Sequence, residues 1–311
     1  HLQLWLFFAF FSAFAVKMPM FPIHTWLPDA HTEAPTAGSV LLAGVLIKMG
    51  AYGFLRFSLP MFPYAVKMLF IPLLALSVTA IIYGAYVTLM QSDMKRLIAY
   101  SSVSHMGFVT LGIFTLNQNG IEGGILQMIN HGIITGGLFL CVGMIYERTH
   151  TRMIEDYGGL FKTVPIFVVF FGIFTLAAIG FPGMNAFVGE FLIISGAFKA
   201  NILIAALSIL GIVLGVVYMV WLYYRVALNE INPNTRSQLT DLDLREITTL
   251  IPLVVLVFFI GLQPGVLLSY MHVSVEHLIE HVNATLPIDN LEVYDPVSLF
   301  AQYLKEIIGW V

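Results

Sequence analysis

Charged residues are scarce in this 311-residue sequence. Asp, Glu, Lys and Arg make up 10% of it, whereas soluble domains carry about a quarter. Hydrophobic residues make up 59%, and the mean hydropathy is +0.88. This composition excludes an ordinary soluble domain, and the formal net charge of -4 argues against a nucleic-acid partner. The sequence predicts a membrane protein in contact with lipid.

Cysteine is almost missing too, and Cys141 lies inside an apolar run. Disulfide frameworks and iron–sulfur clusters each need several cysteines. The sequence also lacks the glycine-rich turn between strand and helix that binds dinucleotides. We therefore expect no metal, no disulfide and no redox cofactor bound by this chain.

The apolar residues form long unbroken runs, not the alternating segments of about ten residues that are typical of transmembrane strands. A helix needs about 20 apolar residues to cross a membrane. The sequence therefore predicts an all-α fold, a polytopic transmembrane helical bundle. The eight expected spans are Leu2–Phe21, Thr36–Phe57, Val66–Met90, Leu97–Leu116, Gly120–Tyr146, Val164–Phe198, Ile202–Ala227 and Thr248–Met271.

Two of these spans are interrupted. The sixth is too long for one straight helix and carries Gly180-Phe181-Pro182-Gly183 in its middle, so we expect two half-helices there. Pro19 and Pro22 make the end of the first span irregular. Unwound backbone at membrane depth is tolerated only inside protein or beside a water-filled cavity. Both breaks are therefore expected in the interior of the bundle.

Three charged side chains stand in apolar surroundings. Lys48 lies near the middle of the apolar run from Ala37 to Phe54, where an ammonium group costs about 2.5–3.5 kcal/mol on insertion. Its stem is too short to reach either end of the span, so snorkelling is excluded. Lys17 and Glu190 stand beside the two proline breaks. Buried charges at broken helices indicate a pathway for ions or protons.

Polar stripes run along the fourth and fifth spans. Ser101 and His105 lie one turn apart, and Gln127, His131 and Thr135 share one helix face. The hydroxyl and amide groups are expected to hydrogen-bond between helices, at about 0.6 kcal/mol each. The two histidines are candidate proton carriers, because imidazole changes charge near neutral pH. The predicted relay residues are Lys17, Lys48, His105, His131 and Glu190.

Basic residues are unevenly divided between the two ends of the expected spans. One end collects Lys95, Arg96, Arg148, Arg152, Lys162, Arg225, Arg236 and Arg245, and the other collects Arg56, Lys67 and Lys199. Cytoplasmic loops carry the excess of lysine and arginine. We therefore expect residues 91–96 and 228–247, and a loop at residues 24–31, on the cytoplasmic side. The C-terminal tail is expected outside.

That tail contains an amphipathic segment, Val273–Val282, which predicts a helix lying at the membrane interface. His277 and His281 are spaced as metal ligands would be on a helix, but they lack a third ligand, so no metal site is predicted. At the other terminus, the run after His1 lacks the basic leading residues of a signal peptide. We expect a piece that starts inside a longer protein.

Four long motifs occur in order along the chain. They are KMPMFPIHTWLPDAHTEAPTAGSVLLAGVLIKMGAYGFLRF, DMKRLIAYSSVSHMGF, LQMINHG and FPGMNAFVGEF. Together they resemble the antiporter-like subunits of respiratory complex I, from the first residues to about Met271. The family has fourteen spans in two inverted five-helix repeats, each with a broken helix.

The resemblance implies a division of the chain and roles for its charged residues. Residues 1–57 would end the first repeat, residues 58–227 would form the second with its break at 180–183, residues 228–271 would hold a loop and the last span, and residues 272–311 the tail. Lys17 matches the lysine of the first broken helix, and Lys48 the central lysine of the next helix. His105 and His131 match relay histidines.

Glu190 matches the acidic residue of the second broken helix. Sibling subunits L and N carry lysine there, so the glutamate indicates the M type. The glutamate that pairs with the first lysine in this family would lie upstream of His1.

The implied function is proton translocation by the membrane arm of a NADH:quinone oxidoreductase, coupled to quinone reduction in another subunit. A lysine removed from water loses its proton more readily, and a nearby carboxylate opposes that loss, so one moving charge could switch the relay. The resemblance implies L and N subunits and lipid as partners, with NAD, FMN, iron–sulfur clusters and quinone in partner subunits. It also implies a bacterial inner membrane.

Two other functions remain open at this point. Subunits of multi-subunit Na+/H+ antiporters and of membrane-bound hydrogenases share the same fold. A structural membrane scaffold is a different class, and three buried charges argue against it, because a scaffold would be more stable without them.

Overall fold

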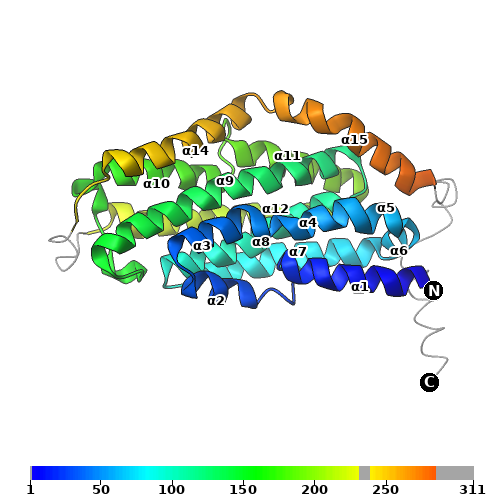
Figure 1. Ribbon diagram of the computed structural model, residues 1–311, viewed down its shortest axis with the longest axis horizontal. Coiled ribbons are helices and arrows are strands. Elements are labelled where there is room, and N and C mark those ends of the chain that lie inside the picture. Colours follow the sequence, from blue (N-terminus) through cyan, green and yellow to red (C-terminus); the bar gives the residue numbers. More distant parts are fainter. Residues whose placement is uncertain (1, 231–238, 285–311) are drawn as a thin grey trace, which may run out of the picture.

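The computed structural model describes residues 2–230 and 239–284, and within them the fold is all-α (Figure 1). Long helices run side by side along the longest axis of the molecule. The described residues also include one isolated β-bridge, between Asp93 and Met153. Six helices in this part of the chain are long and apolar enough to cross a membrane. The predicted fold class is confirmed.

The first crossing is built from two helices, α1 (Leu2–Lys17) and α2 (Trp26–Glu33). The 16 residues of α1 extend about 24 Å, which is short of the 30 Å of a hydrocarbon core. Figure 1 shows α2 continuing α1 along the long axis. The expectation of a loop at residues 24–31 is therefore wrong. Prolines without an N–H donor end α1, but Trp26 begins a new helical segment.

The second crossing, Thr36–Met61, contains two π-helical turns. Its parts are α3 (Thr36–Leu41), η1 (Leu42–Leu46), α4 (Lys48–Gly53), η2 (Phe54–Ser58) and α5 (Leu59–Met61). The predicted span Thr36–Phe57 lies within it. Each π turn shifts the hydrogen-bond pattern by one residue, as in Ile47 N–H to the Leu42 carbonyl. Such a shift re-aims the side chains that follow, beginning with Lys48.

The central helices follow the predicted spans closely. They are α6 (Pro63–Met68), α7 (Phe70–Leu89), α8 (Met94–Phe114), α9 (Gln118–Thr149), α10 (Pro165–Ala178), α11 (Asn185–Ala200) and α12 (Ile202–Tyr223) with its π-helical end η5 (Tyr224–Leu228). Asp93, Asn117 and Asn201 cap the starts of α8, α9 and α12 by accepting backbone N–H groups. The third predicted span starts late, at Phe70, because Leu69 departs from helical geometry.

The break predicted in the sixth span separates α10 from α11. Gly180 and Gly183 have positive φ angles of 69° and 90°, which side-chain-bearing residues rarely adopt. Pro182 between them removes an N–H donor. Each half, with 14 and 16 residues, is too short to cross alone.

The last predicted span, Thr248–Met271, is corrected to two helices, α14 (Leu244–Leu262) and α15 (Gly265–Ala284). Pro264 lacks an N–H donor, so the helix ends before it. The capping box of Asp243 and Glu246 starts α14 earlier than predicted. The predicted helix at 273–282 falls within α15, whose Val275 and Val282 are buried in the described chain.

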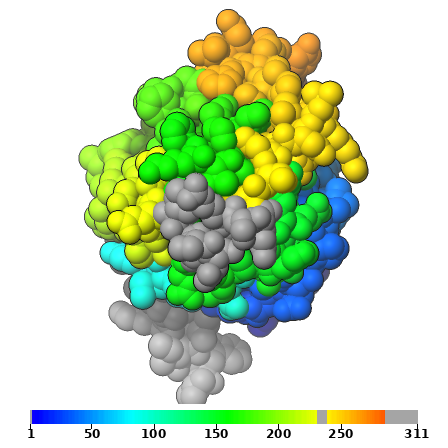
Figure 2. Space-filling view, turned by 90° about the vertical axis from the view of Figure 1, so that its left-hand side faces the viewer, coloured from blue at the N-terminus to red at the C-terminus, as the bar shows by residue number. Residues whose placement is uncertain are grey.

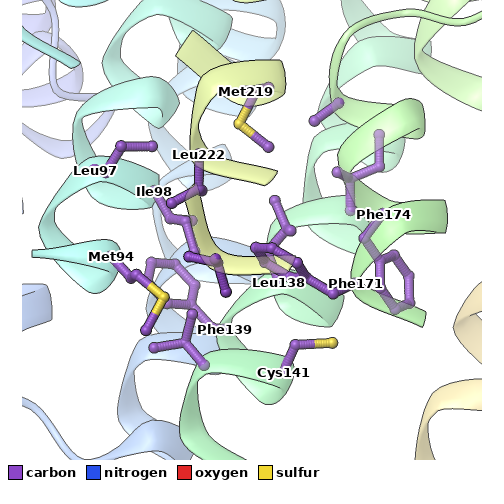
Figure 3. Packing of buried hydrophobic residues seen from close by; sticks show 14 of the residues in the cluster. Met94, Leu97, Ile98, Leu138, Phe139, Cys141, Phe171, Phe174, Met219 and Leu222 are labelled. Atoms are coloured by element: carbon purple, nitrogen blue, oxygen red, sulfur yellow. The ribbon is translucent and has the colours of Figure 1, made fainter. Parts of the chain in front are cut away.

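Side-chain packing surrounds the polar interior with two apolar clusters. Figure 3 shows one of them, where α8, α9, α10 and α12 contribute residues such as Ile98, Leu138, Phe174 and Leu222. The other includes Val103 and Val109 of α8. The polar stripe of α8 therefore passes from one apolar cluster to the next, and helix α8 is almost entirely buried.

Salt bridges of basic residues lie where α9 ends and α14 begins, at the end of the bundle that faces the viewer in Figure 2. Arg148 donates to both carboxylate oxygens of Glu246, at 2.6 and 2.7 Å. Arg152 lies 3.4 Å from the Asp93 carboxylate and donates to the Thr32 carbonyl. This pairing ties the ends of α2, α8, α9 and α14 together. The membrane side of this end stays a prediction.

Candidate functional site

Lys48 is buried and faces α9. Its ammonium group lies 2.7 Å from His131 Nδ1 and also donates to the Ala43 carbonyl in the preceding π turn. An acceptor role for Nδ1 requires the tautomer with its proton on Nε2. The described residues place no carboxylate against Lys48. A neutral base, not an acid, is its direct partner.

His131 and His105 stand next to each other on α9 and α8. Their ring centroids are 5.7 Å apart, and His131 Nε2 is buried without a hydrogen bond. A cavity of about 10 Å³, lined by both rings with Ser101, Gln127 and Thr135, adjoins them. It is large enough to admit a water molecule. One water would bridge the unpaired imidazole nitrogen to neighbouring polar groups.

His105 joins the histidine pair to Glu190. Its Nδ1 lies 3.5 Å from Glu190 Oε1, an ion-pair distance, and its Nε2 lies 3.5 Å from the Tyr218 hydroxyl. A second cavity of about 10 Å³ is lined by His105, Glu190 and Tyr218. The two small cavities flank His105 on either side. Both ring nitrogens therefore have a route to a neighbouring proton carrier.

The carboxylate of Glu190 is buried at the break between α10 and α11. Gln127 Nε2 donates to its Oε1 at 3.2 Å. A Cβ on Gly180 would come within 2.8 Å of its Oε2, so glycine leaves room for the carboxylate.

Close packing of α9 on α11 holds these groups in place. A Cβ on Gly123 would lie 2.7 Å from the backbone nitrogen of Ile193, so only glycine allows this approach. Asn130 of α9 donates to the Asn185 carbonyl at the start of α11, at 2.8 Å. This hydrogen bond links α9 to the first residue of α11, directly beside the break.

Four of the five predicted relay residues lie in one line. Lys48 and His131 are in contact, the two histidines are neighbours, and His105 pairs with Glu190. Lys17 does not join them. It is exposed at the end of α1, and the described residues offer it no ion pair. The C-terminal end of α1 itself favours its positive charge.

Several polar residues of the interior escaped the sequence analysis. His24 and His31 are buried at the two ends of α2, each with both ring nitrogens unpaired. Tyr218 stands in an otherwise apolar stretch of α12, so hydropathy gave no signal. Lys95, expected as a topology anchor, is buried and donates to the Ala34 carbonyl. The two histidines flanking Trp26 and Pro28 in the motif HTWLPDAH were the available signal.

A larger cavity, of about 200 Å³, opens at the basic end of the bundle. Glu33, Lys95 and Arg152 line it, together with Phe139 and Tyr146. The His31 ring stacks on Phe139 with centroids 4.7 Å apart. The Phe139 ring therefore stands between this cavity and the buried imidazole of His31.

The described residues contain no cluster of three or more His, Cys, Asp or Glu that could hold a metal ion. The arrangement is suited to moving protons between side chains and small numbers of waters.

The helices and the buried polar line define an all-α membrane protein with a row of neighbouring ionisable side chains in its interior. The chain belongs to the NADH:quinone oxidoreductase/Mrp antiporter transmembrane family, whose profile matches residues 1–217.

Named relatives agree with this assignment. The chain is 52% identical to NADH-ubiquinone oxidoreductase chain 4 of Marchantia polymorpha, over 90% of this chain and 56% of that protein. It is 50% identical to NADH-quinone oxidoreductase subunit M of Rhodobacter capsulatus, over 91% and 56%. A chain in the structure of respiratory complex I from Thermus thermophilus with bound NADH matches with a TM-score of 0.85 at 35% identity, over 90% of this chain and 59% of that chain. The chain spans about half the length of these curated relatives.

Proposed function

We propose that this chain is part of the M-type membrane subunit of a proton-translocating NADH:quinone oxidoreductase. Residues 58–227 would be the second inverted repeat and residues 1–57 the end of the first. The observation that carries the proposal is the line from Lys48 through His131 and His105 to Glu190. Identity of about 50% to relatives named for this enzyme supports the assignment.

The proton path has three steps. A proton passes directly from Lys48 Nζ to His131 Nδ1, which lie 2.7 Å apart. It crosses to His105 through a water in the adjoining cavity. From His105 it reaches Glu190, whose Oε1 lies 3.5 Å from Nδ1. Each carrier is buried, so proton movement replaces the movement of a hydrated ion.

The charge of Glu190 controls where a positive charge is favoured along the path from Lys48 to Glu190. A buried positive charge is costly without a partner, and a nearby anion offsets that cost. With Glu190 ionised, a positive charge is favoured at His105, and with Glu190 protonated it is favoured farther away. Quinone reduction in another subunit would supply the moving charge at the far end. Lys17 would take part where the longer protein places a carboxylate beside it.

Partners would supply the redox chemistry. NAD, FMN, iron–sulfur clusters and quinone belong to other subunits in this proposal. The L-type and N-type subunits would contact this M-type subunit on opposite sides in the membrane. The exposed apolar faces of α1 and α12, with residues such as Trp5, Val213 and Trp221, support contact with lipid or such neighbours.

The cavity at the basic end is the proposed entrance for protons. It holds Glu33 and Lys95, and His31 stands between its Phe139 wall and the relay. His31 is close enough to Lys48 and Lys95 to experience both charges. Replacement of His31 by phenylalanine should slow proton delivery while Lys48 and His131 stay in contact.

The basic end is proposed to face the cytoplasm of a bacterial inner membrane, with the C-terminal tail outside. Single cysteines at Ser92 and His150 should resist an impermeant thiol reagent in whole cells, and cysteines at Lys199 and Ile202 should react. Cys141→Ser provides the background, and permeabilised cells should label at every position. Labelling of positions 150 and 199 from the same side would overturn the orientation and the broken crossing between them.

A Na+/H+ antiporter subunit is the second candidate, because the family description includes Mrp antiporters. Co-purification separates the two. The native complex should contain flavin and iron–sulfur proteins, whereas an antiporter would purify with small cation-transport subunits. Proton uptake that depends on Na+ and not on NADH would contradict the oxidoreductase assignment.

The relay is tested by Lys48→Ala and Glu190→Gln in the full-length protein. We expect each to lower proton translocation at least about tenfold, which corresponds to a barrier higher by about 1.4 kcal/mol. Formation of ΔpH in vesicles is measured together with the amount of assembled complex. Normal pumping at normal complex levels in either variant would refute the relay.

A further inference from the structure

A single charged residue interrupts the most apolar crossing of the described chain. The helix Ile202–Leu228 has a mean hydropathy of 2.7, and Arg225 is its one charged side chain. Arg225 lies in the π-helical turn η5, at the basic end of the bundle. It plays no part in the proton path, which touches α12 at Tyr218, about two turns away.

The guanidinium of Arg225 has unpaired donors. Its Nε and Nη2 are buried without a hydrogen bond, and none of the carboxylates in residues 2–230 and 239–284 forms an ion pair with it. Its Cζ lies 3.8 Å from the centroid of the Trp221 ring. Stacking on an aromatic face attracts the charge but satisfies none of the N–H donors. A buried unpaired donor is unfavourable, so a bound anion would stabilise this end of the helix.

The surface around Arg225 is shaped for an amphiphile. Trp221 and Tyr224 are about half exposed beside it, at the level where aromatic side chains meet lipid headgroups. Below them Val213, Val217 and Val220 form an exposed apolar face. From residue 225 to 213 the helix extends about 18 Å, which is close to one leaflet of hydrocarbon. Figure 2 shows this end of α12 at the periphery of the bundle.

A second basic group adjoins the site. The turn Leu160–Lys162 packs against η5, and its Phe161 and Lys162 are exposed. Positive charge, aromatic rings and an apolar face are thus combined within one leaflet depth. A headgroup with no net charge would be attracted by only part of this arrangement. A phospholipid headgroup with a net negative charge would be attracted by the arginine and the lysine together.

We propose that Arg225 binds the phosphate of an anionic phospholipid. Arg225 is partly exposed, and rotation of its side chain brings the enclosed, unpaired Nε and Nη2 to two phosphate oxygens, since the planar fork of arginine matches that geometry. Trp221 and Tyr224 flank the glycerol region, and the acyl chains lie on Val213, Val217 and Val220. The lipid holds the end of α12 beside the turn at residues 160–162. This site is independent of the proton relay.

The experiment uses the full-length protein in its native complex, reconstituted in nanodiscs of phosphatidylcholine with increasing phosphatidylglycerol. Two quantities are measured: phosphatidylglycerol retained after detergent extraction, by mass spectrometry, and the thermal midpoint. We expect phosphatidylglycerol to raise the midpoint of the wild type and to raise it much less in Arg225→Gln. Arg225→Gln should also retain about one anionic phospholipid fewer per complex.

Arg56→Gln is the matched control, because Arg56 also lies in a π-helical turn but is exposed and at the other end of the bundle. It should behave as the wild type does. Arg225→Lys keeps the charge without the fork and should fall between the two, which covers the case in which Arg225→Gln fails to assemble. Equal lipid retention in all variants would overturn the proposal. Loss of a neighbouring subunit with unchanged lipid retention would overturn it as well, because the occupant would then be protein.

Discussion

The two broken crossings, α1 with α2 and α10 with α11, use the same device with different results. In both, proline ends a half-helix and an ionisable residue stands near the gap. Glu190 is buried, accepts from Gln127 and pairs with His105. Lys17 is exposed without a partner among the described residues.

The difference shows that a break does not make a site by itself. It provides free backbone groups and a change of direction, but the charge is retained in the interior only where neighbouring helices enclose and pair it. Around Glu190, α8, α9 and α12 contribute that enclosure through His105, Gln127 and Tyr218. Around Lys17, the described residues contribute none.

The largest effect is expected when the enclosed charge is reversed. Glu190→Lys would place a positive charge beside His105 and block the relay, with translocation lowered about a hundredfold or more. Glu190→Asp keeps the carboxylate with a shorter reach and should retain part of the activity. ΔpH formation in vesicles, normalised to assembled complex, measures both. Equal activity of the two variants would show that position 190 needs only a polar group.

The geometry of the enclosed break is tested by two glycine substitutions. Gly180→Ala and Gly183→Ala both pay about 1–2 kcal/mol for a positive φ angle. Only at Gly180 would the new Cβ come 2.8 Å from Glu190 Oε2, whereas nothing lies within 4 Å of it at Gly183. We expect similar losses of thermal stability but a lower rate of proton translocation in Gly180→Ala alone. Matching translocation rates would mean that the carboxylate can move without cost to function.

The smallest effect is expected at the open break. Lys17→Gln removes an exposed charge, so the stability of this 311-residue chain in detergent should change by about 0.5 kcal/mol or less. The thermal midpoint provides the measurement. In the full-length protein the same change should lower translocation, if the longer chain encloses Lys17 as α8, α9 and α12 enclose Glu190. A large destabilisation of the short chain would show that Lys17 is already paired within it.

Much of the fold could be predicted from composition and from the positions of proline and glycine. Apolar length located the crossings, and Pro182 with its flanking glycines located the second break. Two predictions failed for the same reason. The sequence predicted a loop at residues 24–31, where α2 begins at Trp26, and one helix over residues 248–271, where α14 ends at Leu262, because hydropathy alone does not locate helix ends near prolines. Prolines mark where a helix ends, but not whether the chain continues in the same direction.

For the site, helical spacing identified most of the residues but none of their pairings. Ser101 with His105, and Gln127 with His131, were assigned to helix faces from their spacing alone. That these two faces meet depends on the close packing of α9, which glycine at positions such as 123 permits. Tyr218 carried no signal, since a tyrosine among apolar residues is as typical of a core as of a site.

The sequence by itself determined that this protein lies in a membrane, where its crossings break, and which side chains are too costly to be there without a purpose. The reason is local: transfer free energy and helix propensity are properties of a segment. Only the tertiary structure decided that Lys48 meets His131, that Glu190 is enclosed, and that Lys17 is left open. Those outcomes depend on distances between helices far apart in the chain, which close packing sets and no single segment encodes.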